Sequence, residues 1–244
     1  MEQAREKLIV ALDVETAERA LDLFDALRDV AGMFKIGSQL FTAAGPDVVR
    51  QIIKRGGRVF LDLKFHDIPN TVAAAGIEAT RLGVSIFNIH AGGGMEMMKR
   101  TAEAAAEIAT REDLAKPAVI AVTVLTSLNS DSLSQLGINK DPEFLVKSFA
   151  RAASVCGLDG VVASPWEIQV IRRDIPGPGF LVITPGVRPA NATPDDQRRV
   201  MTLVEAIRAG ADYLVVGRPI LSATDPADAA RKLIDEIEIG LRAG

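Results

Sequence analysis

Short apolar runs rich in Val, Ile, Leu and Phe recur along the whole chain, and each is followed by a segment with helical periodicity. Continuous apolar runs of this length are typical of parallel strands that are buried on both faces, with helices crossing between them. The pattern predicts eight strands, at residues 8–13, 33–37, 58–63, 84–90, 118–125, 159–164, 180–185 and 212–217.

The segments between these runs are amphipathic, and several end in Gly, as helices commonly do. Eight strand–helix units in 244 residues predict a (β/α)8 TIM barrel that forms a single domain over residues 1–244. An open, doubly wound sheet is the alternative. In both architectures the active site lies at the carboxyl ends of the strands.

Composition and charge narrow the class of protein. The chain is 48% hydrophobic and 25% charged, and its net charge of −4 is spread along the sequence, so we expect no general affinity for nucleic acid. The amino terminus lacks the pattern of a signal peptide, and no apolar run is long enough to span a membrane. We therefore expect a cytoplasmic protein. The single cysteine, Cys156, excludes an internal disulfide and is expected only to pack.

Polar side chains gather at the predicted carboxyl ends of the strands: Asp13, Lys35, Asp62, Lys64, His90, Thr126, Ser127, Ser164, Arg188 and Arg218. Within "FLDLKFHDIPN", alternation along the strand sends Asp62 and Lys64 toward the barrel mouth, and Asp67 follows in the next loop, where Asn70 or Thr71 can cap the following helix. The alternative is an ordinary solvated ion pair of small energetic value.

A lysine between two carboxylates is suited to donating a proton. At about 4 Å each opposite charge favours the ammonium form by up to about 4 kcal/mol at an effective dielectric of about 20. A Schiff-base lysine, by contrast, must be neutral. We therefore interpret Lys64 as a proton donor to a carbanion. Lys35, at the end of the neighbouring strand, is expected to offset the charge of Asp62 and hold it in place.

A second candidate site binds an anion. Gly217 and Arg218 follow the eighth predicted strand, a frequent place for phosphate in such barrels. Arg188 and Gln197, in the long connection after the seventh strand, could reach the same phosphate, or could stabilise the loop and begin the next helix. Thr126 and Ser127 could contact a ligand carbonyl or cap a helix.

Other residues are given structural roles. His66 and His90 lack a cluster of further ligands, so no metal site is predicted. The "HAGGGM" stretch lacks the spacing of a phosphate-binding loop and is interpreted as a tight connection. Trp166 is expected to pack beneath the loop after the sixth strand.

Several of these fragments together closely resemble the bacterial type of the orotidine 5′-phosphate decarboxylase family: "KIG", "DLKFHDIPNT", "TVLTS", "TPGVRP", "DDQRR" and "YLVVGRPI". The resemblance runs essentially end to end. It implies conversion of orotidine 5′-monophosphate to UMP and CO2 in pyrimidine biosynthesis, with no metal and no organic cofactor. It also implies a homodimer with active sites at the interface.

The resemblance also implies roles for individual residues. Lys64 becomes the proton donor to C6, within a charged network to which Asp67 is contributed across the dimer interface. The remaining roles are ribose binding for Asp13 and Lys35, a ligand contact for Thr71, pyrimidine contacts for Thr126 and Ser127, and phosphate contacts for Arg188, Gln197, Gly217 and Arg218.

Two rival functions stay open from the sequence. A magnesium-dependent sugar-phosphate decarboxylase or aldolase shares the Asp-x-Lys-x-x-Asp motif, but Lys35 stands where its metal-binding carboxylate would be expected. A non-catalytic nucleotide-binding barrel would keep only the phosphate site.

Overall fold

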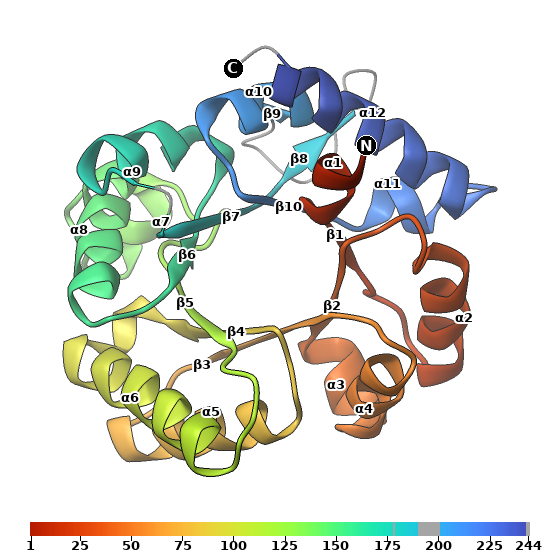
Figure 1. The fold of residues 1–244 in the computed structure, drawn as a ribbon. Helices are drawn as coiled ribbons and strands as arrows, with labels where there is room; N and C mark the ends of the chain where they lie inside the picture. The colour runs from red at the N-terminus through yellow and green to blue at the C-terminus, as the bar shows by residue number, and fades with distance from the viewer. Residues whose placement is uncertain (178, 190–200, 243–244) are drawn as a thin grey trace.

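The chain forms a closed barrel of parallel strands inside a ring of helices (Figure 1). The computed structural model describes residues 1–177, 179–189 and 201–242. The eight barrel strands in these residues are β1 (Leu8–Ala11), β2 (Met33–Gly37), β3 (Val59–Phe65), β4 (Ile86–His90), β5 (Ala118–Val122), β6 (Gly160–Val162), β7 (Leu181–Pro185) and β10 (Tyr213–Val216). They neighbour one another in sequence order, and β10 closes the barrel by pairing with β1. The predicted (β/α)8 architecture is confirmed.

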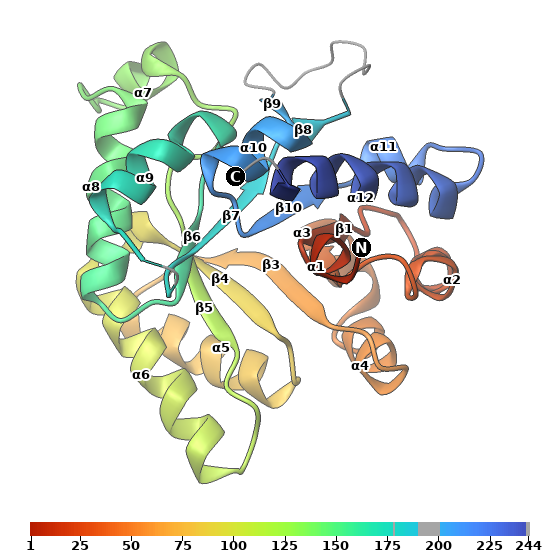
Figure 2. The ribbon, with the colours of Figure 1, turned by 45° about the horizontal axis from the view of Figure 1, so that its top comes forward.

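Helices connect the strands and cover the outside of the barrel, as Figure 2 also shows. They are α1 (Glu2–Glu6), α2 (Ala17–Leu27), α3 (Ser38–Ala44), α4 (Asp47–Lys54), α5 (Pro69–Arg81), α6 (Met95–Arg111), α7 (Ser130–Gln135), α8 (Pro142–Val155), α9 (Ile168–Asp174), α10 (Leu203–Ala209), α11 (Arg218–Leu221) and α12 (Pro226–Arg242), with 3-10 turns η1 (Ala91–Gly93) and η2 (Pro165–Glu167). Within the described ranges, none of these helices combines the length and apolarity needed to cross a membrane.

Local sequence sets where these helices start and stop. Helix α8 begins after Asp141, whose carboxylate accepts the Phe144 N–H at 2.8 Å, and Pro142 occupies its first position. Helix α10 ends at Gly210, whose φ of 106° is in the left-handed region that glycine adopts readily. These signals fix the helix lengths, and so the directions in which the chain returns to the barrel.

Two apolar cores hold the barrel together. One lies inside the barrel and is built from alternate strand residues, among them Met33, Phe60 and Ile120. The other lies between the strands and the helices; there Phe24 of α2 meets Phe34 of β2 edge-on, with ring centroids 4.9 Å apart. Because alternate residues of a strand face opposite layers, each strand contributes to both cores.

A small second sheet was not predicted. It pairs β8 (Val187–Arg188) with β9 (Met201–Thr202) in parallel, beside α10 (Figure 2). Two-residue strands carry no periodic pattern, which is why the sequence gives no indication of them.

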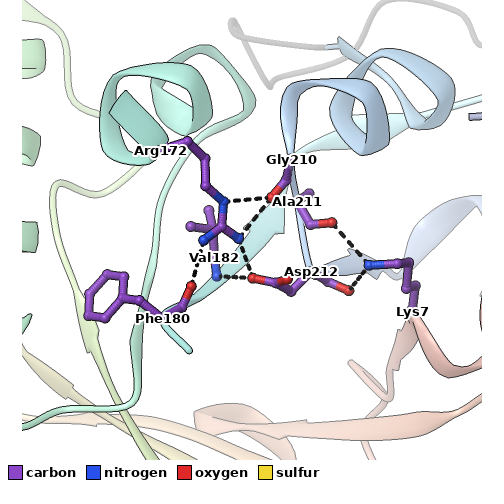
Figure 3. A network of polar contacts seen from close by, with 7 residues as sticks. All are labelled: Lys7, Arg172, Phe180, Val182, Gly210, Ala211 and Asp212. Atoms are coloured by element: carbon purple, nitrogen blue, oxygen red, sulfur yellow. Dashed lines mark hydrogen bonds and ion pairs between the residues drawn. The ribbon is translucent and has the colours of Figure 1, made fainter. Parts of the chain in front are cut away.

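A polar network joins residues at the amino ends of β1, β7 and β10 (Figure 3). Arg172 of α9 donates through Nε to the Gly210 carbonyl at 2.9 Å and through Nη1 to the Phe180 carbonyl at 2.6 Å. It also pairs with Asp212, whose Oδ2 accepts the Val182 N–H at 2.7 Å. The guanidinium therefore ties α9 to the starts of β7 and β10.

Lys7 extends this network to the start of β1. Its Nζ donates to the Asp212 carbonyl at 3.2 Å and lies 3.4 Å from the Ala211 carbonyl (Figure 3). Burial lowers the pKa of Lys7 more than the nearby Asp212 carboxylate raises it.

Replacing Arg172 with alanine should lower the free energy of unfolding by about 2–3 kcal/mol, because two carbonyls and one carboxylate lose a charged donor. That is a fall in melting temperature of roughly 5–10 °C. Arg50→Ala removes an exposed pair with Asp47 and serves as the control, with an expected loss below about 1 kcal/mol. Urea denaturation measures both variants. Equal losses in the two would contradict a structural role for the network.

Candidate active site

The inward-facing positions of three neighbouring strands change from apolar to polar toward the carboxyl ends of the strands. Lys35 of β2, Asp62 of β3 and Asn88 of β4 each come two residues after an apolar side chain of the barrel interior, namely Met33, Phe60 and Ile86. Since parallel strands end at the same side of the barrel, this change places polar groups together at its mouth.

Four side chains at the barrel mouth form a row of alternating charge, called the charged row below: Asp13, Lys35, Asp62 and Lys64. Lys35 Nζ lies 3.0 Å from Asp13 Oδ1 and 3.2 Å from Asp62 Oδ2, and Lys64 Nζ lies 2.7 Å from Asp62 Oδ1. The side chains of Lys35 and Asp62 are only 9% and 13% exposed, whereas that of Lys64 is 37% exposed. Lys64 is therefore the more accessible of the two lysines to a ligand in the mouth.

The backbone of Lys64 has an unusual conformation. Its φ is 52°, in the left-handed region that costs a non-glycine residue about 1–3 kcal/mol. Between Leu61 and Phe65 the pairing shifts, so that four steps along β3 match two along β4. The Lys64 N–H then donates to the side chain of Asn88, at 2.8 Å to Oδ1. This bulge directs Lys64 away from a regular strand geometry.

The structure brings together three of the four predicted catalytic residues. Lys35, Asp62 and Lys64 are in direct contact, and Asp62 is too buried for the alternative of a solvated surface pair. Asp67 behaves differently: it is exposed, and its Oδ1 accepts the N–H of its neighbour Ile68 at 2.6 Å. Within the described part of this chain, no ion pair joins Asp67 to Lys64.

Residues beside the charged row correct some details of the sequence prediction. Neither Asn70 nor Thr71 caps α5, because the helix starts earlier, at Pro69, with Ile68 in the cap position. Thr71 lies exposed in its first turn. The predicted fifth strand stops at Val122 and not at residue 125, so Thr126 and Ser127 lie in the loop that follows.

The structure of that loop excludes the alternative that Thr126 or Ser127 caps the following helix. The cap of α7 is Asn129, whose Oδ1 accepts the Ser132 N–H at 2.9 Å, so neither Thr126 nor Ser127 has the capping role. Thr126 is half-buried and Ser127 is exposed.

The predicted anion-binding residues lie after β7 and β10. Arg188 is only 8% exposed and belongs to β8, while Gly217 precedes the short helix α11 and Arg218 is its exposed first residue. Gln197 lies outside the described residues. Gly37 lies beside Asp13 and Lys35 of the charged row: a Cβ at this position would lie 3.1 Å from Lys35 Nζ and 3.3 Å from Asp13 Oδ1.

His66 and His90 stack on each other next to the charged row. Their ring centroids are 5.0 Å apart with an interplanar angle of 16°, and His90 Nδ1 accepts the Gly92 N–H at 3.3 Å. Burial, then His66, then Lys64 lower the pKa of His90 below its ordinary value of about 6.5. His90 is thus held in its neutral form.

The lowered pKa of His90 makes stability depend on pH. The unfolded chain takes up a proton near pH 6.5 while folded His90 does not, so this group lowers stability as pH falls below that value. A His90→Gln variant should therefore lose less unfolding free energy than the wild type between about pH 7.5 and pH 5.5. Urea denaturation at both pH values measures the difference, and identical losses would contradict the assignment.

Two further residues complete the comparison with the sequence. Trp166 is 61% exposed, so the expectation that it packs beneath its loop was wrong; Ser164 and Glu167 form a capping box that turns it outward. Cys156 is a buried free thiol whose Sγ lies 3.3 Å from the Met95 carbonyl, and burial raises its pKa.

Sequence reasoning missed Asn88. It is fully buried, accepts the Lys64 N–H and donates through Nδ2 to Asp62 Oδ1 at 2.7 Å. The signal was present, because Asn88 is an inward-facing polar position in the apolar run "SIFNIH".

A metal centre is not apparent in this geometry. Over residues 1–177, 179–189 and 201–242, no three His, Cys, Asp or Glu side chains converge as ligands for a metal ion.

Comparison with known proteins places this chain in a family. The chain is 56% identical over 239 residues to the orotidine 5′-phosphate decarboxylase of Geobacter sulfurreducens, an alignment that covers 98% of this chain and 99% of that protein. Its structure matches the crystal structure of orotidine 5′-phosphate decarboxylase from Lactobacillus acidophilus with a TM-score of 0.83 at 35% identity, covering 94% of this chain and 98% of that one.

A more distant structure has the same fold. The orotidine 5′-phosphate decarboxylase from Pyrococcus horikoshii is 26% identical, with a TM-score of 0.74 over 95% of this chain and 99% of that one. The family model "Orotidine 5'-phosphate decarboxylase / HUMPS family" matches residues 6–233. The chain belongs to the orotidine 5′-phosphate decarboxylase/HUMPS family.

Proposed function

We propose that this protein decarboxylates orotidine 5′-monophosphate to UMP and CO2, the last step of pyrimidine nucleotide synthesis, without a metal or organic cofactor. Family membership and the printed names of the relatives support the reaction. The observation that carries the proposal is the charged row, in which a partly exposed lysine, Lys64, contacts a nearly buried aspartate at 2.7 Å. A cytoplasmic location goes with this role.

In the proposed reaction the bond between C6 and the carboxylate carbon breaks and CO2 leaves. The electron pair remains on C6, and Lys64 Nζ then gives C6 a proton and recovers one from solvent. A vinylic carbanion of this kind has no electron sink in the ring, so stabilisation of its transition state must reach roughly 20 kcal/mol. Lys64 contributes by placing a positive charge where the negative charge develops.

The other members of the charged row hold Lys64 in place. Asp62 Oδ1 lies 2.7 Å from Lys64 Nζ, and opposite charges this close attract each other. Lys35, held between Asp62 and Asp13, offsets the charge of both carboxylates. In the proposal, Asp13 and Lys35 also bind the ribose, since Asp13 lies at the exposed end of the row.

The phosphate is proposed to lie near Arg188, Gln197, Gly217 and Arg218, and the pyrimidine near Thr126 and Ser127, with Thr71 as a further contact. Support for the phosphate position comes from α11, a four-residue helix after the last barrel strand, which is where such barrels often bind phosphate. Binding energy gained at the phosphate is useful for catalysis only if it is realised in the transition state at C6.

The active form is proposed to be a homodimer in which Asp67 of one subunit completes the charged network of the other. Asp67 is exposed in this chain, and its neighbour Ile68 is 67% exposed, as an interface residue of an isolated subunit would be. Helices α5 and α6 lie side by side next to this loop, and a shallow groove between them is lined in part by Ala73, Ala74 and Ile77.

The test of the proposed function is turnover by the purified protein. Orotidine 5′-monophosphate should lose its orotate absorbance, with UMP and CO2 formed in equal amounts. A protein that binds UMP but leaves the absorbance unchanged would instead be a non-catalytic nucleotide-binding barrel.

A further inference from the structure

Asn88 is a fully buried polar side chain at the centre of the barrel mouth, and it serves two neighbours at once. Its Oδ1 accepts the backbone N–H of Lys64 at 2.8 Å, and its Nδ2 donates to Asp62 Oδ1 at 2.7 Å. The same Asp62 oxygen also accepts a hydrogen bond from Lys64 Nζ at 2.7 Å. Asn88 therefore contacts both the backbone that carries the lysine and the carboxylate that the lysine pairs with.

The carboxamide of Asn88 satisfies both neighbours at once. The Lys64 N–H can only donate and an ionised Asp62 can only accept, so the residue at position 88 must offer one acceptor and one donor. A leucine has a similar shape but offers neither group. An ionised aspartate offers acceptors alone and would place a second negative charge against Asp62.

The contact with the Lys64 backbone also falls where the sheet gives that backbone no regular partner. The shifted pairing between β3 and β4 lies at this point, and Lys64 has its φ of 52° there. A backbone in this region persists only where its surroundings impose it. The side-chain carbonyl of Asn88 is the group that holds the Lys64 N–H in place.

We propose that Asn88 is a positioning residue for proton transfer: it fixes the left-handed backbone of Lys64 and the orientation of Asp62, and so aims the Lys64 ammonium. The inference rests on the proposed function of Lys64. It predicts that changes at Asn88 act on kcat, while binding of the nucleotide through its distant phosphate is retained.

The first test removes both hydrogen bonds. Asn88→Leu should lower kcat by about 100-fold or more, since small misplacements of a reacting group have effects of this size. The dissociation constant for UMP should change by less than about threefold. The matched control is Thr184→Val on β7, whose buried hydroxyl has no hydrogen-bond partner within the described part of the chain. Its kcat should equal that of the wild type.

The second test uses pH. In Asn88→Asp, the new carboxyl group replaces the amide that contacts Asp62 Oδ1, the oxygen that also pairs with Lys64 Nζ. The nearest other titratable groups are Lys35 of β2, which pairs with Asp62 Oδ2, and His90, two residues along β4. Two adjacent carboxylates share one proton, and the protonated form can donate to Asp62 while still accepting the Lys64 N–H. The kcat of this variant should therefore fall as pH rises and recover toward acid pH. We expect no such dependence in the pH profile of the wild type.

The outcomes separate this inference from the proposed function. Wild-type kcat in Asn88→Leu, or an equal loss at every pH in Asn88→Asp, would overturn the positioning role. If the wild type itself does not decarboxylate, the proposed function fails, and crystal structures decide the role of Asn88. In Asn88→Leu, a Lys64 φ that turns negative would support the role, and one that stays near 52° would overturn it.

Discussion

Replacing Lys64 with alanine should lower kcat for orotidine 5′-monophosphate by about 10⁵-fold, because one side chain supplies both the proton and the positive charge near C6. Binding of UMP should remain measurable, since the residues proposed to bind the phosphate, Arg188 and Arg218, lie after other strands. Initial rates and calorimetric titration with UMP measure the two effects separately.

The control for this change is another lysine, Lys232→Ala, which removes an exposed pair with Asp228 on α12 and should leave kcat unchanged. Retention of more than about 1% of wild-type activity by Lys64→Ala would contradict its role as the proton donor. Borohydride treatment during turnover should trap no substrate on Lys64, because the proposed role of Lys64, paired with Asp62, is to donate a proton and not to form a Schiff base.

Mixing two inactive variants should restore activity if Asp67 acts across the dimer interface. Lys64→Ala and Asp67→Ala subunits that recombine at random form hybrid dimers in which one of the two sites has both residues intact. About a quarter of all sites are then complete in an equal mixture, as expected for a twofold-symmetric dimer. Activity of the mixture should approach about a quarter of the wild-type value.

The matched control mixes equal amounts of Lys64→Ala and a Lys64→Ala/Asp67→Ala double variant, a pair that can form no complete site. Native mass spectrometry shows whether hybrid dimers have formed. Hybrid dimers that stay as inactive as the parent variants would place Asp67 and Lys64 in the same subunit's site and contradict the proposal.

The barrel could be predicted because its strands are continuous apolar runs of similar length. The ends of the strands were harder to predict. The first strand stops at Ala11, two residues before Asp13, and the fifth stops at Val122, while β3 continues to Phe65. Apolar composition predicts burial, but a residue leaves the sheet when its backbone hydrogen bonds find other partners, and those depend on the neighbouring strand.

The charged row was predictable in part. Alternation correctly placed Asp62 at the barrel mouth, and Leu61 and Leu63 pack toward the helices. The left-handed backbone of Lys64 was not predictable, because glycine is the usual signal for such a conformation and lysine gives none. Asp67 is three residues from Lys64 along the chain but has no ion pair with it within the described residues, and its role across a dimer interface stays a prediction.

Turnover of orotidine 5′-monophosphate by the purified wild-type protein in excess EDTA decides whether the reaction needs a metal ion. We predict an undiminished rate of loss of orotate absorbance, because Lys64 and the charged row are proposed to supply the chemistry. Activity that disappears in EDTA and returns with magnesium would contradict it.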